Sequence, residues 1–330
     1  MKKKYQNIFF FVGLAILAVM LTQLDYHEVW AGISRAGYWF LAVVGIWFFL
    51  YVMNTAAWWI IINSQATPPT FSSRWPSFLW LYKVTVSGFA LNYATPGGLL
   101  GGEPYKIMML APKLGTKQAT ASVILHTMTH IFSHFWFWLL SCVLYVCIEP
   151  LNVFMTIILS LVTLFCLTAI WFFLKGYKRG IAVSILHIVG HIPYAKRWAI
   201  RFMDNHAGQL SEIDHQIAAL HNQNRFTFLT AVLLELSCRI ISALEIYFCL
   251  LVILPSPSYL ESILILAFTS LFANMLFFIP LQLGGREGGF LMSAGGLGLT
   301  ASAGIFVALL VRLRELIWTA IGLLLIKLEK

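Results

Sequence analysis

The chain has 330 residues, of which 60% are hydrophobic and only 11% are charged, too few charges to cover a soluble domain of this length. It is therefore predicted to be an integral membrane protein. The net charge of +9 bears on membrane topology rather than on nucleic acid, and no nucleic acid is expected as a partner. The five cysteines fall inside apolar segments, without the spacing of disulfides or of a metal site.

Apolar runs long enough to cross a membrane recur along the chain, since about 20 residues span the hydrocarbon core. The first run follows three lysines and resembles a signal peptide, but no small-residue cleavage site follows it, so a retained span is expected. In chain order the six expected full spans are 8–24, 39–62, 120–147, 152–174, 226–253 and 302–326. Two further apolar segments, 78–94 and 259–279, each run directly into a break rich in proline and glycine.

Basic residues orient these spans. The loop 175–225 has an excess of basic over acidic residues, whereas the loops 25–38, 148–151 and 254–258 contain Arg35 as their one lysine or arginine. By the positive-inside rule the N-terminus and the long loop are cytoplasmic. Within that loop, Leu210, Ile213, Ile217 and Leu220 recur at helical spacing, which predicts a short amphipathic helix on the cytoplasmic surface.

The breaks share one pattern. Both "YATPGGLLGGEPYK" (93–106) and "FFIPLQLGGREGGFLMSAGG" (277–296) fit Pro-x-x-x-x-Gly-x-Glu, ending at Glu103 and Glu287. Irregular backbone survives in lipid only when it is buried in protein or lines a wet cavity. Segments 78–110 and 259–298 are therefore predicted to be re-entrant hairpins that enter from opposite faces, as an inverted repeat.

The fold class follows from these elements. The sequence predicts an all-α, polytopic helical membrane protein with about six full spans and two re-entrant hairpins. Residues 1–330 form a single domain with a first half 1–174, a cytoplasmic loop 175–225 and a second half 226–330. The expected location is the cytoplasmic membrane of a bacterial or archaeal cell, crossed several times.

The second helix of each hairpin is expected to point its N-terminus at a central cavity. Pro104 suits the first turn of such a helix, and the free N–H groups there form an anion site to which Lys106 and Arg286 add positive charge. Glu103 and Glu287 either compensate their own helix dipoles or meet a cation, which is a protein arginine or a positive headgroup. The cation is favoured, because a charge at mid-membrane costs about 2.5–3.5 kcal/mol and the dipole returns about 0.3–1 kcal/mol.

Other charges fall inside apolar helices. Glu235 and Arg239 are four residues apart, which predicts an ion pair within one helix and leaves open whether the pair lines a pathway. In the last helix, Arg312 and Arg314 cannot both be neutralised by Glu315. A phosphate or Glu287 is the expected partner of the arginine in excess.

Three histidines form a stripe along one helical face. His126, His130 and His134 could bind a metal or relay protons, but one straight helix cannot bring three ligands to a single ion. The default is a polar, cavity-facing stripe or interhelical hydrogen bonding. No metal and no cofactor is expected.

At both breaks the chain resembles a known family, the lysylphosphatidylglycerol synthase transmembrane region or flippase-like family. The likeness rests on "NYATPGGLLGGEPYK", on "PLQLGGREGG" and on an arginine in the last helix. The resemblance implies a lipid-flipping fold and carries functional roles to Thr95, Pro96, Gly97, Gly101, Gly102, Glu103, Gly285, Arg286, Glu287 and Arg312. To these expected substrate-binding residues we add the buried charges Lys106, Arg239 and Arg314.

The sequence departs from the family pattern in two respects. Members often carry an acidic–basic pair where this chain has His126 and Thr127. The aminoacyl-transferase members also have a soluble C-terminal catalytic domain, and this chain ends at Lys330, so the resemblance implies the translocating part alone.

The expected function is therefore transport of a polar-headed phospho-, aminoacyl- or glycolipid between leaflets, with an anionic headgroup as the substrate feature that is bound. Two alternatives stay open. One is an integral-membrane transferase acting on a lipid-linked sugar or amino acid, although the three aspartates are isolated and form no Asp-x-Asp site. The other is a non-transporting partner of a lipid-modifying enzyme. No catalytic residue is predicted, and the oligomeric state is left open.

Overall fold

The computed structural model describes residues 26–64, 76–94, 101–176, 208, 225–275, 285–297 and 299–328. The expected span 8–24 and the expected surface helix at 210–220 lie outside the described residues. So do Thr95, Pro96 and Gly97 at the first break, and the side chain of Glu287 at the second.

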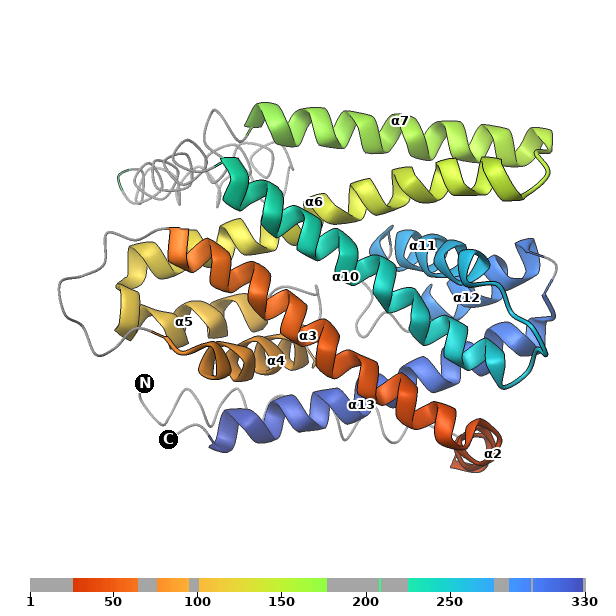
Figure 1. The fold of residues 1–330 in the computed structure, drawn as a ribbon, viewed down its shortest axis with the longest axis horizontal. Helices are drawn as coiled ribbons and strands as arrows, with labels where there is room; N and C mark the ends of the chain where they lie inside the picture. Colours follow the sequence, from red (N-terminus) through yellow and green to blue (C-terminus); the bar gives the residue numbers. More distant parts are fainter. Residues whose placement is uncertain are drawn as a thin grey trace, which may run out of the picture.

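The described residues form an all-helical structure, as the apolar runs predict (Figure 1). Four helices among them are long and apolar enough to cross a membrane. They are α3 (Tyr38–Ser64), α6 (Thr116–Ile148), α7 (Val153–Gly176) and α10 (Arg225–Leu251). These helices correspond to four of the six expected spans, and large apolar side chains on their outer faces are exposed, as lipid contact requires.

The last expected span, 302–326, lies within α13 (Ala301–Leu328). This helix has 28 residues and is about 42 Å long at 1.5 Å per residue, which is enough to cross a membrane. It is more polar than the four apolar helices because Arg312, Arg314 and Glu315 lie in its middle. All three side chains are buried inside the protein.

The expectation that residues 25–38 form a loop is wrong for most of that stretch. It contains α2 (Tyr26–Ala36), an 11-residue helix, which a search for membrane-spanning runs misses because it is too short. Gly32 places α2 against α13, since a Cβ there would lie 2.8 Å from Leu309 Cδ2. Gly37, at φ +54°, then turns the chain into α3 in a conformation that glycine adopts at little cost.

Each of the two sequence breaks separates a pair of short helices. The first pair is α4 (Phe78–Ala94) and α5 (Gly102–Leu114), and the second is α11 (Tyr259–Met275) and α12 (Gly285–Gly296). The two pairs lie toward opposite ends of the molecule, and α5 and α12 both begin near its middle and run outward (Figure 1). Pro104 occupies the first turn of α5, as predicted.

Glycines allow these short helices to pack closely. A Cβ on Gly102 would lie 2.1 Å from the carbonyl oxygen of Gly88, so α5 touches the backbone of α4. A Cβ on Gly322 would lie 2.5 Å from Ala90 Cβ, which brings α13 equally close to α4. The second pair repeats the arrangement with wider spacing, since a Cβ on Gly289 would lie 3.2 Å from Thr269 Cα. Small residues thus replace the hydrophobic effect as the means of joining helices within lipid.

Candidate functional site

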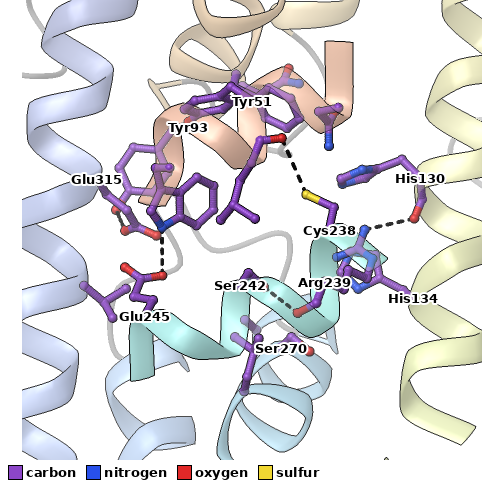
Figure 2. A pocket seen from close by; sticks show the side chains of 18 of the residues that line it. Tyr51, Tyr93, His130, His134, Cys238, Arg239, Ser242, Glu245, Ser270 and Glu315 are labelled. Carbon is purple, nitrogen blue, oxygen red and sulfur yellow. Dashed lines mark hydrogen bonds between the residues drawn. The ribbon is translucent and has the colours of Figure 1, made fainter. Parts of the chain in front are cut away.

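A cavity of about 340 Å³ lies between the two helix pairs and the long helices α3, α6, α10 and α13. Its wall is polar although the surrounding helices are apolar. The described lining residues include eight charged side chains: Glu103, Lys106, Glu235, Arg239, Glu245, Arg286, Arg314 and Glu315. These are four acidic and four basic groups, so their formal charges cancel. Figure 2 shows Glu245 and Glu315 on one wall and His130, His134 and Arg239 on the other.

One wall carries a glutamate–arginine network that joins α10, α12 and α13. Arg314 binds Glu245 through two hydrogen bonds, with Nε–Oε1 at 2.6 Å and Nη2–Oε2 at 2.9 Å. Trp47 Nε1 donates to the same carboxylate at 3.0 Å, and the Arg314 guanidinium lies 3.8 Å from the centre of the Trp47 ring. Arg314 is only 4% exposed and Glu245 only 2%, so this pair is fixed and fully desolvated.

The rest of this network is more accessible. Arg286, at the start of α12, forms an ion pair with Glu315, and the Arg286 side chain keeps 30% exposure while Glu315 is buried. The Tyr93 hydroxyl donates to Glu315 and accepts a hydrogen bond from Arg312 Nη1 at 2.6 Å. Arg312 itself lines a smaller pocket behind the cavity, together with Arg286 and Glu315.

The expectation about the last helix is therefore corrected in one respect. The partner of Arg314 is Glu245 on α10, a residue that sequence spacing gave no reason to pair with it. Glu315, the sequence neighbour, lies 3.8 Å from Arg314 Nη2 and its closest basic partner is Arg286. Adjacent residues of a helix point in different directions, so Arg314 and Glu315 bind different partners.

The opposite wall carries the histidine cluster, which comprises His126, His130, His134 and Glu235. His130 Nδ1 lies 2.8 Å from Glu235 Oε2, to which Asn54 Nδ2 also donates at 3.2 Å. His126 Nε2 lies 3.4 Å from Glu235 Oε1, without the alignment of a hydrogen bond. The predicted role of the histidines in a cavity-facing stripe and in interhelical bonding is confirmed, and the described residues contain no cluster suited to a metal ion.

The predicted ion pair between Glu235 and Arg239 is wrong. Arg239 Nε donates to Ser133 Oγ at 2.8 Å and Nη2 donates to the carbonyl of His130 at 2.9 Å. Both acceptors lie on α6, which packs against α10, and Glu235 meets the α6 histidines one turn away. Both side chains therefore form their polar contacts with α6 and not with each other. Both residues line the cavity.

At the third corner of the cavity Glu103 pairs with a cation, but this cation is neither of the two that the favoured interpretation names, a protein arginine or a positive headgroup. Its partner is Lys106 of the same helix, with Nζ at 3.2 Å from Oε1, and Thr127 Oγ1 donates to the same oxygen at 3.4 Å. The buried Lys106 ammonium also lies 4.9 Å from the centre of the Phe89 ring, and its stem packs over Gly88. The dipole and the lysine therefore both stabilise the Glu103 carboxylate.

The start of α5 offers less room for an anion than the sequence predicts. The backbone N–H of Gly102 donates to Asn92 Oδ1 at 2.7 Å, and the carboxylate of Glu103 occupies the same first turn. A side-chain oxygen and a carboxylate thus already use the positive end of this helix. The predicted backbone anion site at α5 therefore has one N–H group fewer to offer.

The predicted substrate-binding residues fall into three groups. Those that line the cavity are Glu103, Lys106, Arg239, Arg286 and Arg314, while Arg312 lies in the adjoining pocket. Gly101, Gly102 and Gly285 mark the starts of α5 and α12 and act through the backbone. The remaining four, Thr95, Pro96, Gly97 and Glu287, lie where the structure gives no side-chain description.

Several polar lining residues were missed by sequence reasoning. Trp47, Asn54 and Tyr93 donate hydrogen bonds to carboxylates of the cavity, and Asn92 accepts one from the backbone N–H of Gly102. Asn54 was detectable, because an amide in the middle of an apolar span is expensive unless it is bonded. Trp47 and Tyr93 were not, since aromatic residues are frequent throughout these helices.

Long apolar helices around a buried, charged cavity define the class, a multi-pass helical membrane protein. The chain belongs to the family described as the lysylphosphatidylglycerol synthase TM region, whose model matches residues 8–322. The family resemblance inferred from the two break motifs is confirmed, and it associates the chain with membrane lipid. No curated protein and no solved structure matched the chain.

Proposed function

We propose that this protein translocates a polar-headed lipid between the two leaflets, with an anionic headgroup passing through the central cavity. The observation that carries the proposal is the cavity itself. A charge at the bilayer centre costs about 2.5–3.5 kcal/mol on insertion scales, yet eight charged side chains of the described residues surround this space. Charged side chains that are this unfavourable inside a membrane usually mark a path for a polar substrate.

The cavity size supports a headgroup rather than a whole lipid. Its volume of about 340 Å³ lies at the lower end of the range for small-molecule sites. The acyl chains would then stay in the membrane, along the exposed apolar faces of the outer helices. In this proposal the protein is a transporter and not an enzyme, and turnover of an aminoacyl or nucleotide-sugar donor by the purified protein would contradict it.

Arg286 is the residue best suited to receive a phosphate. Glu245 binds Arg314 through two hydrogen bonds, and Arg314 is almost fully buried, so it forms part of the wall. Arg286 is the more exposed arginine of the network and has Glu315 as its carboxylate partner. A phosphate entering the cavity can replace Glu315 on Arg286 through the paired N–H geometry that arginine offers.

The arrangement of the helix pairs supports the transport cycle. We interpret α4–α5 and α11–α12 as re-entrant hairpins related by an inverted repeat, because the pairs lie toward opposite ends and their second helices start near the middle (Figure 1). The positive-inside rule makes the N-terminus cytoplasmic. Rocking of one hairpin against the other would then expose the cavity to each leaflet in turn.

A leaflet-exposure assay tests this function. The full chain is reconstituted in vesicles that contain fluorescent phosphatidylglycerol, and an impermeant quencher reports how fast the lipid changes leaflet. The wild-type protein is expected to accelerate exchange over protein-free vesicles, and Arg286→Gln to lower that acceleration at least about tenfold, because removing a charge-assisted pair costs about 1.5–3 kcal/mol. Arg35→Gln, on the exposed face of α2, is the matched control. Equal rates with and without wild-type protein would contradict transport of this lipid class.

A further inference from the structure

The charges that line the cavity are balanced before any headgroup arrives. Among the described lining residues, the four carboxylates match the four basic side chains. An anionic headgroup adds at least one negative charge to this enclosed space. An unbalanced charge inside a membrane is costly, so binding is favoured if a positive charge enters together with the anion.

The histidine cluster is the place where the cavity can change its charge. Histidine is the side chain whose charge changes near neutral pH, and three histidines of α6 line the cavity wall. Two of them contact the Glu235 carboxylate, through His130 Nδ1 at 2.8 Å and His126 Nε2 at 3.4 Å. A carboxylate held between two imidazoles can share one added proton, which shifts the charge of the cluster from −1 to 0.

Several buried polar atoms around Glu235 lack a hydrogen-bond partner among the described residues. Both ring nitrogens of His126, Glu235 Oε1 and Asn54 Oδ1 lack a hydrogen-bond partner among the described residues, and His126 and Glu235 are each 1% exposed. A buried unsatisfied polar atom costs about 1–3 kcal/mol. A protonated His126 would donate to Glu235 Oε1 and satisfy both atoms. Trp58, stacked on the His126 ring at 5.6 Å, would also stabilise the imidazolium through a cation–π contact.

The charged neighbours act in opposite directions on this protonation. Glu103 on α5 and Glu235 on α10 attract a proton, whereas Lys106 on α5 and Arg239 on α10 repel it. His134 of the same cluster and the buried thiol of Cys238 on α10 are further titratable groups of this wall within the described residues. Burial of the cluster disfavours the charged imidazolium, and one further negative charge in the cavity favours binding of the proton.

We infer that binding of an anionic headgroup is coupled to the uptake of one proton by His126, His130 and Glu235. The inference rests on the proposed function and adds its coupling ion. Linkage is reciprocal, so headgroup affinity rises as the pH falls toward the range in which the cluster is protonated without a headgroup. A proton gradient across the membrane would then favour loading on the more acidic side and release on the other.

Calorimetry measures the coupling directly. Dihexanoyl phosphatidylglycerol is titrated into the purified full chain near neutral pH, in two buffers that differ in their heat of protonation. The wild type is expected to take up about one proton per lipid bound, and the variant His126→Gln/His130→Gln close to none. His27→Gln is the matched control, because His27 is an exposed histidine of α2 outside the cavity lining, and it is expected to keep the proton uptake.

The outcomes separate this inference from the proposed function. Lipid binding by the wild type without proton uptake overturns the inference and leaves transport standing, as does unchanged uptake in the double variant. Neither binding nor translocation by the wild type overturns both. If the double variant fails to fold, the pH profile of wild-type translocation decides. The rate should rise by up to about tenfold per unit as the pH falls from about 8 to about 6, and a flat profile contradicts the coupling.

Discussion

The arginines that line this cavity differ in how completely glutamates satisfy them. Arg314 receives both oxygens of Glu245 and a ring face of Trp47, whereas Arg286 shares Glu315 with the Tyr93 hydroxyl. The first arrangement suits a structural element and the second suits a group that exchanges partners. We therefore expect substitutions at the Arg314 pair to affect stability and substitutions at Arg286 to affect transport.

Glu245→Gln is therefore expected to lower stability strongly. The substitution leaves the Arg314 guanidinium buried without a counter-charge at its main partner, which typically costs about 3–5 kcal/mol. The unfolding midpoint of the detergent-purified protein, followed by heating, measures the effect. The double variant Glu245→Gln/Arg314→Met should recover part of the loss, because replacing both members of a buried pair is far less harmful than removing one.

Glu149→Gln serves as the control for this change. Glu149 follows the end of α6 and lies outside the cavity lining. Its substitution should therefore change the free energy of unfolding by no more than about 0.5 kcal/mol and leave the unfolding midpoint close to that of the wild type. A Glu245→Gln protein as stable as the control would show that the network does not hold α10 to α13.

At the scale of elements, the two breaks in the helices could be predicted from the proline and glycine residues at the breaks themselves. Proline and glycine act on their own backbone, so the pattern that ends at Glu103 and Glu287 predicts where α5 and α12 start without reference to the fold. The helix α2 was missed for the opposite reason. Its place is set by packing on α13 at Leu309, which no local pattern of a short segment specifies.

The contact between α4 and α5 predicts the result of adding one methyl group. Gly102→Ala places a Cβ where the Gly88 carbonyl oxygen and the Asn92 side chain already lie, at 2.1 Å and 2.6 Å. The two helices must separate, which is expected to cost at least about 1–3 kcal/mol and to break the hydrogen bond from the Gly102 N–H to Asn92. The yield of monodisperse protein and its thermal midpoint measure the loss.

Gly45→Ala is the matched control for the glycine substitution. Gly45 lies within α3, exposed on its outer side, and a Cβ there meets nothing within 4 Å. Alanine is the better helix former by about 0.5–1 kcal/mol, so this change should be neutral or slightly stabilising. If Gly102→Ala behaved like Gly45→Ala, the close approach of α4 and α5 would not exist in the membrane.

At the scale of the whole molecule, the sequence identifies the polar residues of the cavity but not their partners. A charge inside an apolar run is conspicuous, so Glu103, Arg239 and Arg314 could be selected as site residues. The pairing of Arg314 with Glu245 spans 69 positions, and that of Tyr93 with Glu315 spans 222. Such pairings depend on which helices become neighbours, and single-helix spacing gave the wrong partner for Arg239.

The whole-molecule arrangement makes a prediction about sidedness. The start of α6 and the end of α13 lie at one end of the molecule, whereas the α6–α7 turn and the connection from α10 to α11 lie at the other (Figure 1). With a cytoplasmic N-terminus, the first end faces the cytoplasm and the second faces outward. Exposed positions at these sites are Lys117, Leu328, Asn152 and Ser256.

Single cysteines at these positions, in a background without the five native cysteines, report the sidedness. An impermeant maleimide added to intact cells is expected to label Asn152→Cys and Ser256→Cys, and to label Lys117→Cys and Leu328→Cys only after the membrane is opened. The pair Ser256→Cys and Leu328→Cys is decisive, because one position precedes the second helix pair and the other ends α13. If both react from the same side, α11 and α12 together cross the membrane and are not a re-entrant hairpin, so the inverted repeat on which alternating access depends is lost.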